Sequence, residues 1–313
     1  MARFVLRRLA LSLPLLFIVP FLTFVMVALA PGDAARTILG EDFTPAAYEA
    51  LRHELGLDRP LLVRYGSWLA DALQGDLGKS PITGLGVTDE IASRVWVTVS
   101  LVVATTLVAA LIGIGLGVLS SIRQNRLARL VDVVSLVGFS LPSFWVGLVL
   151  VALFSVALGI FPATGYVPLD VSPNQWALAL VLPVAALSFH ALAAIAKQTR
   201  DAMLDVLSRD YITSLRAHGI SERSIVLKHA LRNAAIPVST VVGLLFIGLL
   251  DGTVLVESVF AMPGLGGLVV DATFAHDMPV LQGVVVTFTL AVIVINLIVD
   301  IAYGWFNPKA RLQ

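Results

Sequence analysis

Long apolar runs without a charged residue alternate with short charged segments along the whole chain. Six of these runs have 18 residues or more: Leu9–Gly32, Val95–Ile122, Val133–Leu169, Val171–Ala196, Asn233–Leu250 and Met278–Val299. A helix needs about 20 apolar residues to cross the roughly 30 Å hydrocarbon core of a bilayer. The pattern therefore predicts an all-α, polytopic membrane protein with six transmembrane helices.

Three of the runs also indicate how their helices begin or end. Val133–Leu169 carries two prolines and a glycine near its end, so we expect one helix followed by an outer loop. The fifth run is expected to continue past Asp251 towards Phe260. The first run follows three arginines, as a secretory signal does, but it exceeds the usual length of a signal core and is expected to remain as an uncleaved anchor.

The composition agrees with a membrane protein and excludes several other classes. Of 313 residues, 58% are hydrophobic and 13% are charged, and the mean hydropathy is +0.92. Soluble domains carry about a quarter charged residues. The net charge is zero, which argues against nucleic acid as a partner, and the absence of cysteine excludes disulfides and thiolate chemistry. No repeat or linker interrupts the chain, so we expect a single domain over residues 1–313.

Basic residues are distributed unevenly between the loops. The amino terminus holds three, the segment 123–132 three, the segment 197–236 seven and the carboxy terminus two (Lys309 and Arg311), whereas the connections before the fourth and sixth spans hold none. Cytoplasmic loops of membrane proteins are enriched in Lys and Arg. We therefore expect these loops and both termini to be cytoplasmic, which leaves residues 33–94 as the outer segment.

The outer segment contains signals for short helices. Thr44 followed by a proline can cap a helix that ends at Gly56, and a second helix is expected between Asp58 and Gly75. Thr88, followed by two acids, can cap the helix that becomes the second span. Gly75–Ser80 resembles the end of a phosphate-binding loop, but the first glycine of that motif is missing, and we treat the match as accidental.

The segment 197–236 predicts two cytoplasmic helices. Apolar residues recur at helical spacing between Met203 and Leu215, opposite charged ones, which is typical of an amphipathic helix. Gly219 suits a left-handed helix end, and Ser221 suits the start of a second helix that continues to Pro237, where the fifth span opens. Such helices can lie among lipid headgroups, but acids on the same surface favour a docking site for a cytoplasmic protein.

Polar residues within the spans are candidates for a passage or for contacts between helices. They are Asp251, His190, Asn296 and Asp300. The last two lie four residues apart, so they share a face of the sixth helix, and a structural cluster between helices is favoured for them. Asp251 can face a passage or bond to neighbouring helices. No paired acids, zinc-ligand spacing or nucleophile elbow accompanies these residues, so we expect no catalytic and no metal site.

Several motifs together resemble one family of transport proteins. They are "LGLDRPLLVRYGSWLADALQGDLGKS" (Leu55–Ser80), "SLPSFWVGLVL" (Ser140–Leu150), "DYITSLRAHGISERSIVLKHALRNAAIPV" (Asp210–Val238) and "NLIVDIAYGWFNPKAR" (Asn296–Arg311). Their order and spacing resemble B-type permease subunits of ABC importers in the dipeptide, oligopeptide and nickel group. The resemblance covers nearly the whole chain.

This resemblance implies the architecture, the partners and the location of the protein. It implies a six-helix subunit of an alternating-access pore in a bacterial inner membrane, paired with a C-type permease. Two cytoplasmic subunits bind ATP and Mg and hydrolyse the ATP, and an extracytoplasmic binding protein delivers the substrate. Peptides are the favoured substrate. Nickel or another small solute within the same family, and a stand-alone channel or secondary transporter outside it, are the alternatives.

The resemblance also implies a coupling helix in the segment 197–236, seated in a cleft of an ATPase subunit. The residues expected to make this contact are Thr213, Ser214, Leu215, Arg216, Ala217, His218, Gly219, Ile220, Ser221 and Glu222. The wider permease group reads E-A-A at the first three positions, so this chain keeps the glycine of the pattern and departs from the rest of it. His229, Leu231 and Arg232 stand where that group has I, L and P.

Overall fold

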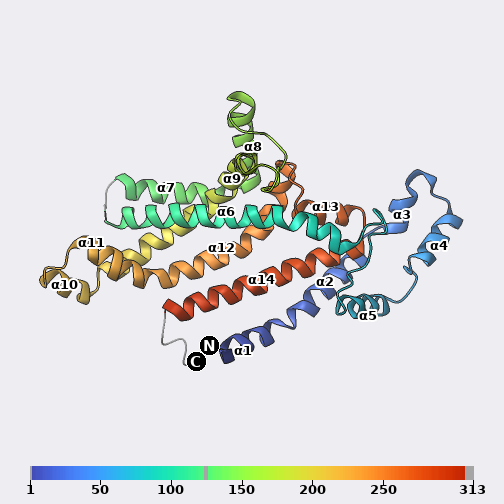
Figure 1. Ribbon diagram of the computed structural model, residues 1–313, viewed down its shortest axis with the longest axis horizontal. Coiled ribbons are helices and arrows are strands. Elements are labelled where there is room, and N and C mark those ends of the chain that lie inside the picture. Colours follow the sequence, from blue (N-terminus) through green and yellow to red (C-terminus); the bar gives the residue numbers. More distant parts are fainter. Residues whose placement is uncertain (1, 123–125, 307–313) are drawn as a thin grey trace. The chain divides into compact units, whose positions relative to one another are not determined.

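The computed structural model describes residues 2–122 and 126–306, and its regular elements in this part of the chain are helices (Figure 1). In chain order they are α1 (Ala2–Ser12), α2 (Leu15–Leu29), α3 (Ala34–Leu39), η1 (Gly40–Asp42), α4 (Pro45–Glu54), α5 (Leu61–Ala72), α6 (Val87–Ile122), α7 (Arg126–Ser140), α8 (Ser143–Leu150), η2 (Val151–Ala157), α9 (Pro173–Leu207), α10 (Asp210–Ala217), α11 (Glu222–Ser224), η3 (Ile225–Ala230), α12 (Leu231–Val259), α13 (Leu265–Phe274) and α14 (Met278–Phe306). Three basic residues used to predict the orientation, Arg123, Lys309 and Arg311, lie outside the described residues.

The helices confirm the predicted all-α membrane architecture. Five helical stretches of the described chain are long and apolar enough to cross a bilayer: Leu6–Leu29, Val87–Ile122, Pro173–Leu207, Glu222–Val259 and Met278–Ile301. A bent pair, Val131–Ser140 with Ser143–Ala157, makes a sixth when it is counted as one span. Each predicted apolar run corresponds to one of these stretches.

The third span differs from the prediction of one helix followed by a loop. The chain bends by 102° between α7 and α8. Pro142 precedes α8 with φ −63° and ψ 138°, and it has no N–H to continue the hydrogen bonds of α7. The residue before a proline is also disfavoured in helical conformation. The later prolines of the run predicted an outer loop, whereas the break at Pro142 was not predicted.

The described residues divide into two compact units, and each is described by itself. Unit 1 comprises residues 2–5, 99–122, 126–262 and 294–306, and unit 2 comprises residues 6–98 and 263–293. Helices α6 and α14 each contribute residues to both units. The single domain expected for residues 1–313 therefore stays a prediction.

Unit 1 is built around close contacts of α9 with α6, α7 and α12. A Cβ atom added to Gly113 would lie 2.9 Å from the Ile195 side chain, and one added to Gly117 would lie 2.5 Å from Thr199. Only glycine permits this separation of α6 and α9, as in other membrane helix pairs with small residues at the contact. Ion pairs add to the packing of α7 and α9, because Arg200 Nη1 lies 2.8 Å from Asp132 Oδ1.

Unit 2 has its own apolar core, formed by the start of α6, α13 and the start of α14. Its buried members are Val87, Ile91, Leu265, Leu268, Ala272, Val280, Leu281 and Val284. The Gln282 amide is fully buried and donates to the carbonyl of Pro20 in α2 over 3.1 Å. A long-range polar contact joins α2 and α14 here, so the first span is attached to the unit by more than apolar packing.

The short helices of unit 2 follow the sequence signals in part. Thr44 caps α4 as predicted, with its hydroxyl accepting from Ala47 N, and Gly56 has the left-handed φ of +65°. The second helix begins at Leu61 behind Pro60 rather than at Asp58. Helix α6 begins at Val87, so Thr88 lies within its first turn and the predicted cap is wrong. The Gly86 carbonyl accepts from the first turn instead.

Candidate functional site

The predicted coupling residues run from the second half of α10 through the connection 218–221 to Glu222, the first residue of α11, beyond the ends of α9 and α12 in unit 1 (Figure 1). These residues, 213–222, are called the coupling turn. Helix α10 ends in a Schellman motif: Gly219 N donates to Arg216 O over 2.9 Å and Ile220 N to Leu215 O over 3.2 Å. Gly219 has φ +77°, a conformation that costs other residues about 1 kcal/mol or more. The sequence signal for a left-handed helix end at this glycine is confirmed.

An ion pair spans this turn. Arg216 Nε donates to Glu222 Oε1 over 2.6 Å, and both side chains remain largely exposed. The hydrogen bond from Arg216 lowers the pKa of the Glu222 carboxyl below its ordinary value. Because the pair lies in solvent, it adds little stability, and its main effect is to hold the two ends of the turn together.

The turn exposes polar groups and is anchored by one apolar residue. Ile212 on α10 is fully buried, whereas the side chains that follow it are mostly exposed. His218 Nδ1 lies 2.7 Å from the Ser214 carbonyl, so the imidazole is oriented by its own helix. The ten predicted residues, 213–222, thus form a continuous surface, with only Leu215 and Ile220 half-buried.

The helix after the turn differs from the prediction. Ser221 precedes α11, but its side chain makes no capping hydrogen bond. The chain then stays helical through the π-helical η3 into α12, and Pro237 lies inside α12 instead of opening the span. The helical stretch that contains the fifth span therefore begins at Glu222, in the coupling turn, and ends at Val259, close to the predicted end.

The four candidate passage residues have different surroundings. His190 Nδ1 lies 3.1 Å from the Gly138 carbonyl, and the imidazole meets the edge of the Phe139 ring at 5.3 Å. His190 also lines a cavity of about 400 Å³ in unit 1, together with Gly248 and Gly252 of α12. His190 is nevertheless exposed in the isolated subunit, and its role stays a prediction.

The other three candidates lie on α12 and α14. Asp251 is exposed in the isolated subunit and does not line the cavity near His190. Asn296 is exposed, and Asp300, one turn further along α14, is half-buried. The roles expected for these three residues stay predictions.

Sequence reasoning missed two polar clusters in unit 2. The Ser80 hydroxyl donates to the carboxylate of Asp277, which is 4% exposed and caps the start of α14 by accepting from Val280 N. Burial raises the pKa of this carboxyl despite the two hydrogen bonds. The second cluster consists of Arg52 and Arg64, which line a cavity in unit 2. The six basic residues of the outer segment could have indicated a positively charged site, but basic residues were used only to predict which loops are cytoplasmic.

Comparisons with known proteins give one consistent result. Residues 109–312 match the family described as the binding-protein-dependent transport system inner membrane component, and residues 1–110 match the amino-terminal region of such membrane components. The glutathione transport system permease protein GsiC of Escherichia coli K12 is 40% identical over 314 residues, all of both chains. A Brucella abortus protein, named as a permease of a peptide transport system, is 40% identical over 312 residues, 99% of both chains.

A solved structure shares the fold. A chain of the MetNI methionine ABC transporter in an inward-facing conformation superposes with a TM-score of 0.58 at 21% identity. The superposition covers 69% of this chain and 96% of that one.

Proposed function

We propose that this chain, which belongs to the family of binding-protein-dependent inner-membrane transport components and forms the pore of an ABC importer, carries small peptides. The observation that carries the proposal is the match over the full length to permeases named for peptides and for glutathione, itself a tripeptide. The chain is a multi-pass protein of the bacterial inner membrane.

The turn of residues 213–222 is the site at which ATP hydrolysis is coupled to transport. Its exposed surface, rigid Schellman geometry and direct continuation into the fifth span support this role. ATP and Mg bind to two partner ATPase subunits, and this chain has no catalytic function of its own. Docking closes the turn against an ATPase, and the helix from Glu222 to Val259 transmits the displacement to the membrane.

The remaining partners are a C-type permease and an extracytoplasmic binding protein. Large apolar side chains are exposed along α6, α12 and α14, including Leu111 at 75%, Leu244 at 65% and Ile298 at 60%. Surface of this kind is covered in the membrane by lipid or by a second subunit. Both termini and the coupling turn face the cytoplasm, as the distribution of basic residues indicates.

The substrate is tested with the complete importer. The two permeases, the ATPases and the binding protein are reconstituted in liposomes, and ATP-dependent uptake of labelled di- and tripeptides is compared with uptake of nickel complexes. Peptide uptake that requires the binding protein supports the proposal. Uptake of nickel complexes without peptides would assign the chain to a metal importer of the same family.

The orientation is tested separately, and the chain is convenient for this because it lacks native cysteine. A cysteine at position 218 is expected to react with an impermeant thiol reagent only from the cytoplasmic side. A cysteine replacing exposed Arg36 in the outer segment serves as the matched control and is expected to react from outside.

A further inference from the structure

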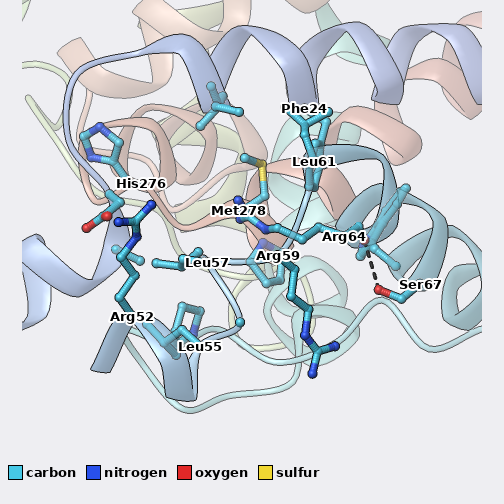
Figure 2. Close-up of a pocket in the computed structure, with 18 of the residues that line it drawn as sticks. Phe24, Arg52, Leu55, Leu57, Arg59, Leu61, Arg64, Ser67, His276 and Met278 are labelled. Carbon is cyan, nitrogen blue, oxygen red and sulfur yellow. Dashed lines mark hydrogen bonds between the residues drawn. The ribbon is translucent and has the colours of Figure 1, made fainter. Parts of the chain in front are cut away.

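Unit 2 contains a cavity of about 710 Å³ with an unusual lining (Figure 2). Its apolar wall comes from the end of α2, where Phe24 is 3% exposed, and from Met278 at the start of α14. Its polar wall comes from the outer segment. A volume of this size is in the range that binds small molecules.

Positive charge dominates the cavity. Four basic side chains line it, and two acids do so: Arg52, Arg59, Arg64, Lys79, Asp33 and Glu54. Among the described residues, none of the four cations lies within 4.0 Å of a carboxylate oxygen. The Asp33 carboxylate is already an acceptor, because it binds Arg36 N at 3.0 Å and the Tyr48 hydroxyl at 2.7 Å. The cavity therefore has unneutralised positive charge.

Two of the arginines line the cavity from different helices, Arg52 from α4 and Arg64 from α5, and the Arg64 guanidinium lies over the Phe24 ring, 5.4 Å from its centroid. Figure 2 shows the Arg52 and Arg64 side chains extending from opposite walls, with the Arg64 guanidinium beside Met278 and the Arg59 guanidinium directed away. Burial lowers the pKa of Arg64, and the neighbouring charge of Arg52 lowers it further, although the Asp33 carboxylate partly opposes this shift. Arg52 Nε and the indole N–H of Trp68 are enclosed and have no acceptor. Two like charges in partial burial, with unused donors, are stabilised by an anion between them.

The surroundings of the cavity indicate where this anion comes from. Helix α5 packs along α2 from the middle of the first span outward: the Tyr65 hydroxyl donates to Phe17 O over 2.8 Å, and the Tyr65 and Phe24 rings form a T-shaped pair. On another side of α5, Leu62 and Val63 are 69% and 53% exposed. The cavity itself is lined by Val27 and Ala28 in the last turn of α2, so it lies at the end of the first span. An amphipathic helix with aromatic residues beside that end is typical of the headgroup region.

We propose that this cavity binds the phosphate group of an anionic phospholipid. Arg52 and Arg64 bind the phosphate oxygens, because guanidinium groups match them as paired donors. Phe24 and Met278 pack against the glycerol and the upper acyl chains. The lipid neutralises the two arginines and joins the outer segment to the first span. Basic pockets beside membrane helices are suited to such headgroups.

The experiment uses the complete importer in detergent, delipidated and then titrated with phosphatidylglycerol or phosphatidylcholine, with bound lipid measured by native mass spectrometry. Phosphatidylglycerol is expected to bind at least about tenfold more tightly than phosphatidylcholine. Arg64→Gln is expected to remove this preference, because both lipids carry a phosphate and only the positive charge of the cavity distinguishes the anionic headgroup from the zwitterionic one. Arg64→Lys keeps the positive charge and is expected to keep part of the preference. Arg36→Gln, an exposed arginine of the same segment outside the cavity, is the matched control and is expected to bind as the unmodified importer does.

Several results would overturn the proposal. Equal retention of the two lipids, or an unchanged preference in an assembled Arg52→Gln, Arg64→Gln double variant, excludes a headgroup site in this cavity. Assembly is checked by size-exclusion chromatography. Inorganic phosphate at millimolar concentration is expected to weaken the binding of phosphatidylglycerol by competition. Binding of phosphate or of a peptide carboxylate by an importer that shows no lipid preference would assign the cavity to a soluble anion.

Discussion

The coupling turn of unit 1 (residues 213–222) and the loop 78–86 of unit 2 are similar in length but are stabilised in opposite ways. In the turn, the hydrogen bonds and the ion pair join residues at most six positions apart, and Arg216 and Glu222 stay exposed. In the loop, Ser80 bonds to Asp277, 197 positions away, and both side chains are almost completely buried. The conformation of the coupling turn is thus fixed by local interactions, whereas that of the loop depends on a residue distant in the sequence.

This difference separates two kinds of role. A turn that is shaped by local bonds leaves its surface free for another protein, so substitutions in it should affect coupling before stability. A loop that is fixed by a buried polar contact has little free surface, and its substitution should affect stability first, since an unsatisfied buried group is costly. The predictions below test this division, starting with the largest expected effect.

Gly219→Asp should abolish peptide uptake and the stimulation of ATP hydrolysis while the subunit still inserts and assembles. A Cβ atom at this position would meet nothing within 4 Å in the isolated chain, and the left-handed backbone costs only about 1 kcal/mol. The defect must then come from the docking partner. ATPase activity of the purified complex in liposomes is the measurement.

Gly75→Asp is the matched control, because Gly75 also has a positive φ, +89°, and open space around it. Its activity should stay near that of the unmodified importer. If both variants fail alike, or if Gly219→Asp keeps normal stimulation, the coupling role of the turn is wrong.

Asp277→Asn should destabilise unit 2 by about 1–3 kcal/mol. The Ser80 hydroxyl already accepts from Ile82 N and Thr83 N, so its single proton needs the acceptor that Asp277 supplies. An amide that presents its N–H₂ group here opposes another donor. The apparent Tm of the complex in detergent should fall, while residual transport at low temperature keeps its normal substrate preference.

Asp271→Asn, at an exposed position of α13, provides the comparison and should leave the Tm unchanged. An unchanged Tm for Asp277→Asn would show that the long-range contact does not stabilise the loop, and the contrast with the coupling turn would then be lost.

The exchange of the pair, Arg216→Glu combined with Glu222→Arg, tests whether these side chains hold the turn or contact the ATPase. If the pair serves only to hold the turn, each single substitution should reduce ATPase stimulation by less than about fivefold, and the exchanged pair should restore it. If either side chain contacts the ATPase itself, the exchange should not restore activity. The stimulation measured for the two single variants and the exchanged variant distinguishes these cases.

Asp251→Asn should have the smallest effect, which is a change in the uptake of cationic peptides relative to neutral ones. An exposed carboxylate on α12 that faces the passage should favour cationic peptides, so its removal should slow their uptake a few-fold relative to neutral ones. Paired uptake assays with lysine-containing and alanine-containing dipeptides measure this ratio. An unchanged ratio in an assembled variant assigns Asp251 to contacts with neighbouring helices or to water.

The sequence by itself determined the features that depend on local composition. The six apolar runs predicted the membrane helices because the thickness of the bilayer sets their length. Gly219 predicted the end of α10 because a left-handed backbone conformation at a helix end favours glycine, whatever surrounds the helix in the fold. Thr44 predicted the start of α4 for a similar reason, since its hydroxyl accepts from a residue three positions away. The assignment of residues 213–222 to the contact with an ATPase came from the family resemblance instead and stays a prediction.

Only the tertiary structure decided which distant groups meet. Ser80 and Asp277 have no local pattern that pairs them, and neither do Gln282 and Pro20, because 197 and 262 positions separate the partners. Arg52 and Arg64 looked like ordinary charges of an outer segment until the fold enclosed them in one cavity. The break before α8 and the helix that continues through Pro237 depended on packing as well, since a proline can end a helix or be accommodated within it according to its neighbours.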